Sequence, residues 1–187
     1  MSLAALEAGS VEMGWHAPRA AQSAALRQAL PWMAPAGPGL YAAVGGRGLS
    51  GWALRALAPA LAEGVAVHWI DAGNRFDERG LDFPSRVRLT RPRDAHELES
   101  FVCAQLPEIW RGELLVLADP FFPLSDAELP ESDAQRVFSR LLQAARAVPA
   151  PWLVLAMPRP CPPPRERMMS RLLHSARRVA TPGAGLG

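Results

Sequence analysis

The chain has 187 residues with 20 basic and 18 acidic side chains, a size that suits one α/β domain with its own core. A hydrophobic fraction of 49% with 20% charged residues excludes a disordered chain, and two cysteines exclude a disulfide framework and a four-cysteine zinc site. The net charge of +2 permits a nucleic-acid partner without requiring one. No apolar stretch reaches the roughly 18 residues of a membrane span and no secretory signal is evident, so we expect a cytoplasmic protein without a membrane partner.

The first third of the chain predicts an arm, a strand and a helix. Residues 1–36 are rich in Ala and broken by Gly and Pro, which indicates a loose N-terminal arm with one short helix over 20–30. Residues 40–44 form an apolar run suited to a buried strand. A glycine-rich turn over 45–51 follows, and residues 52–63 then have the pattern of a helix.

The middle of the chain predicts two further strands and a capped helix. Residues 65–71 are rich in β-branched and aromatic side chains, which favours a strand, and 87–89 predicts a short third strand. A helix is expected over 95–106, with Asp94 as its cap and Glu97 at the capping-box position.

The last third alternates strand and helix again. Apolar runs at 113–119 and 152–157 predict buried strands, and the clearest amphipathic helix lies between them at 132–148. A helix over 165–174 and an edge strand over 176–181 complete the pattern.

This alternation of apolar strands with helices predicts one α/β domain over 37–182, with a parallel sheet covered by helices on both faces, and a flexible tail at 183–187. Ligands bind such sheets at the carboxyl ends of the strands. The glycine turn, Asp71 and Asp119 all lie at such ends, so this edge is the predicted site.

The glycine turn has the spacing of a phosphate-binding loop but lacks its chemistry. The candidate residues of this degenerate nucleotide loop are Gly46, Arg47, Gly48, Ser50 and Gly51. In the pattern G-x-x-x-x-G-K-[ST], Trp52 stands in the lysine slot and Ala53 in the slot of the metal-binding hydroxyl. The chain contains no lysine at all. Two interpretations stay open: a tight turn without a ligand, and a residual anion or nucleotide site.

Several segments, in order and spacing, resemble a known family. They are residues 24–30 leading to 37–41, Ile70-Asp71-Ala72-Gly73-Asn74-Arg75-Phe76, the run 114–119, and 133–148 followed by 152–157. Together they resemble the ATPase core of the RecA/RadA recombinase superfamily, nearer to its RadA branch. The resemblance implies a RecA-like P-loop core in which Asp119 is the Walker B acid, and in which the loops after 113–119 and 152–157 face single-stranded DNA.

The departures from that family concern its catalytic groups. Where the family has the glutamate that polarises the attacking water, this chain has Gly73. The lysine, the metal hydroxyl and the base are therefore missing together, and each is worth several kcal/mol in phosphoryl transfer. We expect a protein that is not an ATPase, with no catalytic residue, no cofactor and no bound metal.

Two surfaces are candidates for binding. Phe121 and Phe122 follow the strand of Asp119 in a proline-flanked loop, and adjacent aromatics there suggest either a loop folded onto the core or a contact for a partner protein or stacked bases. The arginines after the last long strand are a solvated face or a DNA-binding strip. They are Arg159, Arg165, Arg167 and Arg171.

The leading hypothesis is a catalytically inactive paralogue that acts as an accessory or regulatory subunit in homologous recombination and DNA repair. Its expected partner is a recombinase, another paralogue or a repair factor, with single-stranded DNA as a second candidate. A pseudo-ATPase scaffold or regulatory subunit without a role at DNA is the alternative, and an enzyme with an altered nucleotide site is a third reading.

Overall fold

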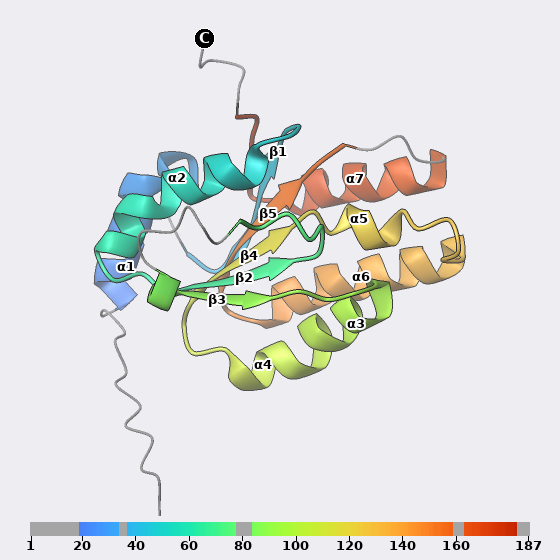
Figure 1. Ribbon diagram of the computed structural model, residues 1–187, viewed down its shortest axis with the longest axis horizontal. Coiled ribbons are helices and arrows are strands. Elements are labelled where there is room, and N and C mark those ends of the chain that lie inside the picture. The colour runs from blue at the N-terminus through green and yellow to red at the C-terminus, as the bar shows by residue number, and fades with distance from the viewer. Residues whose placement is uncertain (1–18, 34–36, 78–83, 159–162, 183–187) are drawn as a thin grey trace, which may run out of the picture.

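The fold is α/β, with six parallel strands in one sheet and helices on both of its faces, as the alternation of elements predicted (Figure 1). The computed structural model describes residues 19–33, 37–77, 84–158 and 163–182. The strand order is β3-β2-β4-β5-β1-β6, and every pair is parallel. The strands are β1 (Gly39–Val44), β2 (Val67–Asp71), β3 (Val87–Thr90), β4 (Leu114–Ala118), β5 (Pro151–Ala156) and β6 (Arg178–Ala180).

One face of the sheet is covered by the N-terminal helices. These are α1 (Arg19–Ala29), the short η1 (Pro31–Met33) and α2 (Leu49–Ala62). Tyr41, Trp69 and Val116 point from three strands into this layer and are almost completely buried. The helix expected in the N-terminal arm therefore belongs to the packed core, where Leu26 and Met33 are buried, while residues 1–18 lie outside the described part of the chain.

The opposite face packs against the later helices. They are α3 (Ala95–Ser100), η4 (Phe101–Gln105), α4 (Leu106–Ile109), α6 (Glu131–Ala147) and α7 (Pro163–Ser175). Alternate strand residues such as Leu117 and Trp152 face this layer, and Val137 of α6 packs among them. Because side chains alternate along each strand, the continuous apolar runs fill two cores at once.

The helix predicted over 95–106 is interrupted. Asp94 caps it as expected, accepting a hydrogen bond from the Glu97 N–H at 2.8 Å. The carboxylate of Glu97 accepts from the backbone N–H of Arg93, one residue before the cap position. After Ser100 the chain makes a π-helical turn, η4, before α4. A hydrophobic pattern with a period of 3.6 residues predicts an α-helix and does not indicate this wider turn.

Two short helices complete the fold. η3 (Pro84–Arg86) precedes β3, and α5 (Phe121–Leu124) follows β4, where the sequence predicted a loop. β3 and β6 are the outermost strands of the described sheet.

Candidate functional site

The predicted site residues gather at the carboxyl edge of the sheet. The Asp119 N–H, just beyond β4, donates to the Leu155 carbonyl at 2.8 Å, and the Gly45 N–H, just beyond β1, donates to the Ala156 carbonyl at 3.2 Å. Both segments are therefore fixed to the end of β5, which lies between β4 and β1. The glycine turn and the Walker B-like acid thus lie on either side of one strand end.

The glycine turn is short. Gly46, Arg47 and Gly48 lie in the turn, with Gly48 at φ 92° as the residue that caps α2. Ser50 and Gly51 already lie in the first turn of α2. A helix that begins this early leaves residues 45–48 to form the turn, whereas the nucleotide-loop pattern would extend it to Gly51.

The two positions at which the nucleotide-loop pattern has a lysine and a metal-binding hydroxyl are used for packing in this chain. The Trp52 ring stacks on Trp32 of η1, with ring centroids 6.5 Å apart and planes at 29°. The side chain in the lysine slot is thereby held in the α1–η1 layer. Ala53 is completely buried among apolar residues, so this position lies in the core and faces no metal site.

Asp119 fills the space beside Gly73, the position for which the resemblance implies a glutamate. A Cβ atom placed on Gly73 would lie 2.9 Å from the Asp119 Cβ and 3.0 Å from its Oδ2. Real Cβ atoms almost never approach other atoms so closely, so no side chain fits there without a shift of the backbone. Asp119 itself has φ 52°, a left-handed backbone conformation that favours glycine.

Two arginines balance the buried acids at this edge. Asp71 accepts hydrogen bonds from the backbone N–H groups of Arg75 (3.0 Å) and Phe76 (2.8 Å) and forms an ion pair with Arg91 at 3.6 Å. This turn brings the Arg75 Nε to 4.0 Å from Asp119 Oδ2. Both carboxylates are 1% exposed, so burying them depends on these cations and donors.

Neither Arg75 nor Arg91 was predicted from the sequence as a site residue. Arg75 lies four residues after Asp71 and forms an ion pair with Asp119, which follows another strand. Arg91 lies directly after β3 and forms an ion pair with Asp71. For Arg75, its place in the loop after a strand that ends in an acid was an available signal, whereas Arg91 follows a strand that ends in Thr90.

The resemblance implies a nucleotide with Mg²⁺ at this edge, and the residues present do not fit them. An apolar ring, a buried methyl group and a glycine against an acid replace the lysine, hydroxyl and glutamate. The acid that remains is close to a guanidinium. Within the described ranges, no three His, Cys, Asp or Glu side chains gather closely enough to hold a metal ion.

Replacing Gly73 with Ala tests this packing. We expect Gly73→Ala to lower the free energy of unfolding by about 1–3 kcal/mol, because the new methyl group overlaps the Asp119 side chain. Asp119→Gly removes that obstacle at a backbone conformation that glycine accepts. In the Asp119→Gly background, Gly73→Ala should therefore cost only a few tenths of a kcal/mol. Urea unfolding of the four proteins measures the coupling, and strictly additive effects would contradict the contact.

The two phenylalanines after β4 differ in their surroundings. Phe121 is 7% exposed, and its ring lies 5.8 Å from that of Phe138 on α6. Phe122 is 45% exposed. Phe121 thus follows the alternative of a segment folded onto the core, whereas Phe122 stays available for contact, because α5 turns successive side chains about 100° apart and directs one of them into the core.

Of the four arginines proposed as a DNA-binding strip, the structure describes two side chains. Arg167 is exposed. Arg171 is also exposed, but it donates a hydrogen bond to Ser139 at 3.2 Å and lies over the Phe138 ring at 5.5 Å, so it joins α7 to α6. Arg159 and the side chain of Arg165 lie outside what the structure describes.

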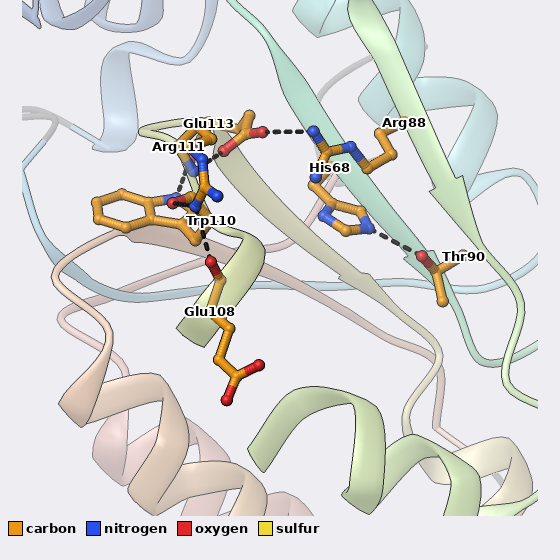
Figure 2. Close-up of polar contacts among 7 residues, drawn as sticks. All are labelled: His68, Arg88, Thr90, Glu108, Trp110, Arg111 and Glu113. Atoms are coloured by element: carbon orange, nitrogen blue, oxygen red, sulfur yellow. Dashed lines mark hydrogen bonds and ion pairs between the residues drawn. The ribbon is translucent and has the colours of Figure 1, made fainter. Parts of the chain in front are cut away.

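A second polar cluster lies under α3 and η4 (Figure 2). His68 of β2 is fully buried, its Nε2 lies 2.8 Å from the Thr90 hydroxyl, and its Nδ1 has no hydrogen-bond partner among the described residues. Burial, and secondarily the nearby Arg88, lower the pKa of His68 to about 4, against a smaller opposing effect of Glu113. His68 is therefore neutral at pH 7.

Glu113 connects this cluster to the chain before β4. Its carboxylate accepts the Arg111 N–H at 2.7 Å and pairs with Arg88 at 3.4 Å, while its carbonyl accepts the Trp110 indole N–H at 3.0 Å (Figure 2). Every one of these contacts stabilises the entry into β4, so we assign the cluster to folding.

Two comparisons of the sequence with known proteins found no match. A scan of the sequence against profiles of known families gave no match, and a search among curated proteins found no significant similarity. In the parts of the chain that the structure describes, no helix is long and apolar enough to cross a membrane.

Proposed function

We propose that this protein is a catalytically inactive RecA-like subunit that acts in homologous recombination and DNA repair by binding a partner recombinase, paralogue or repair factor. One observation carries the proposal: Asp119 occupies the space beside Gly73 that a catalytic glutamate would need. The acid at the Walker B-like position fills this space and lies near Arg75.

The rest of the edge supports the same function. Trp52 and Ala53 use the nucleotide slots for packing, while the six-stranded core is complete and tightly filled. A core that keeps its architecture without the catalytic groups still offers surfaces for assembly. Binding of a protein partner is therefore the activity that this molecule retains in the proposal, with single-stranded DNA as a second candidate partner.

A scaffold or regulatory subunit with no role at DNA is the second candidate. The arrangement of Arg171 favours it, because this arginine is engaged by Ser139 and Phe138 of α6. Salt dependence of binding to an oligothymidylate separates the two candidates. A phosphate strip of three or four arginines gives a slope of log affinity against log salt of roughly −2 to −3. No binding at low salt favours the scaffold.

We expect no ATP hydrolysis above background by the purified protein with Mg²⁺, with or without single-stranded DNA. The reason is the joint replacement of lysine, hydroxyl and glutamate at Trp52, Ala53 and Gly73, since each lost group removes several kcal/mol of transition-state stabilisation. Phosphate release measures the rate. A turnover that disappears in Asp119→Ala would contradict the proposal.

The partner half of the proposal has its own experiment. The active recombinase from the same organism is immobilised, and binding of the purified protein is measured together with the recombinase's DNA-dependent ATP turnover. We expect binding and a change in that turnover. If neither is observed, the recombination assignment fails.

A further inference from the structure

The exposed ring of Phe122 opens onto a hollow of about 470 Å³ at the carboxyl edge of the sheet. The residues that line the hollow come from α5, the start of α3 and the connection from α5 to α6. Its apolar lining comes from Phe122, Pro123, Leu129 and Pro130. Phe122 and Val179 are the two large apolar side chains that are exposed in the described part of the chain, and Phe122 is the one that lines this hollow.

The charges around this hollow are mostly negative. Asp94, Asp126 and Glu128 line it, and all three are exposed. Arg93 is the one arginine in the lining, and it is already paired with Glu97 at 2.9 Å. No cation pairs with Asp126 or Glu128 among the described residues. The hollow is thus acidic on a protein whose net charge is +2.

The backbone at Phe122 is fixed before any partner binds. Its N–H donates to the Asp119 carbonyl at 3.0 Å, and its own carbonyl accepts from the Ser125 N–H at 3.2 Å. Pro120 and Pro123 restrict the backbone on either side. Beneath it, Phe121 anchors the same short helix in the core. On a fixed backbone, an aromatic side chain has only two torsions left to order on binding, and aromatic residues are typical of those that dominate protein interfaces.

We propose that the hollow beside Phe122 is a docking site for a basic segment of a protein partner, one that places a large apolar side chain against Phe122 and Leu129 and arginine or lysine side chains near Asp126 and Glu128. The proposal rests on the function proposed above, and it adds the chemistry of the partner. Apolar burial supplies the affinity, and the acidic rim supplies the selection for a positively charged segment.

The same charges argue against stacked bases on Phe122. A single strand that stacked on this ring would bring its phosphates near Asp94, Asp126 and Glu128, and like charges at short distance repel. The position of Phe122 after the strand of Asp119 made a DNA contact an open alternative from the sequence. The charge of the assembled hollow favours the protein partner.

The test uses a short fluorescein-labelled peptide with one central Phe between pairs of Arg, and two matched peptides with Ala in place of Phe or Glu in place of Arg. Fluorescence anisotropy measures binding to the full chain. We expect the Phe–Arg peptide to bind best, and Phe122→Ala to weaken it about tenfold. Glu128→Lys should weaken the binding of this peptide and make that binding less dependent on salt. Two control variants should leave peptide binding unchanged. Val179→Ala removes the other exposed apolar side chain, and Glu63→Lys makes the same change of charge at a distant exposed site.

The outcomes separate this proposal from the proposed function. Absent binding of the Phe–Arg peptide, or equal binding by the Phe122→Ala protein, overturns the docking site even if the recombinase still binds. Peptide binding that depends on Phe122, together with no binding of the recombinase, keeps the docking site and rejects the recombination role. If Phe122→Ala weakens the binding of an oligothymidylate and leaves the binding of the peptide unchanged, Phe122 stacks bases and the docking site is rejected.

Discussion

Replacing Phe121 with Ala is expected to lower the free energy of unfolding by about 3–5 kcal/mol, the usual cost of removing a buried phenylalanine ring. Phe121 is 7% exposed and packs against Phe138, and it also lines an apolar hollow of about 410 Å³ between α5 and α7. Removing the ring would enlarge that hollow, and the surrounding atoms relax only in part. Urea unfolding, or a fall of roughly 10 °C in the melting temperature, measures the loss.

The neighbouring residue provides the matched control. Phe122→Ala removes the same atoms from the same short helix, but at a 45% exposed position, so its cost should stay within about 0.5 kcal/mol. A similar loss for both variants would mean that α5 as a whole, and not the burial of one ring, determines the effect. This pair also shows that the Phe122 variant is folded when it is used in binding experiments.

Lowering the pH from 7 to 5 is expected to remove about 2 kcal/mol of stability through His68 alone. The pKa of this histidine is about 4 in the folded protein and near its ordinary value of 6.5 in the unfolded chain. The unfolded state therefore binds more protons between these two values, and the contribution of His68 is fully present above pH 6.5 and is lost as the pH falls toward 4.

A variant isolates this contribution from that of the acidic groups. His68→Leu keeps a buried side chain and removes the titrating group, so its free energy of unfolding should fall less between pH 7 and pH 5 than that of the wild type. An identical pH dependence for wild type and His68→Leu would contradict the assignment. The comparison does not require the two proteins to be equally stable at pH 7.

The order of elements could be predicted well because it depends on local patterns. The apolar runs at 40–44 and 152–157 became buried strands, and the amphipathic pattern at 132–148 became α6 within a residue at each end. The cap at Asp94 followed from one side chain and a backbone group three residues away. Such signals lie within one or two turns of the chain, where the periodicity of side chains and the capping residues act.

The closure of the candidate site could not be predicted in the same way. The resemblance predicted that Gly73 stands where the family has a glutamate, but it did not predict that Asp119 fills the space beside Gly73. The contact joins the ends of β2 and β4, which are neighbours only because the strands adopt this order. The Arg75–Asp119 pair spans the same two strand ends.

By itself, the sequence determined that the chain forms a parallel α/β sheet covered on both faces and that no lysine is present to bind phosphate. Only the tertiary structure decided that Trp52 stacks on Trp32 and that one of two adjacent phenylalanines is buried while the other opens onto an acidic hollow. The physical reason is the separation along the chain over which each interaction acts. Backbone geometry and hydrophobic periodicity act between near neighbours in the chain, whereas burial and charge pairing depend on which distant segments the strand order brings together.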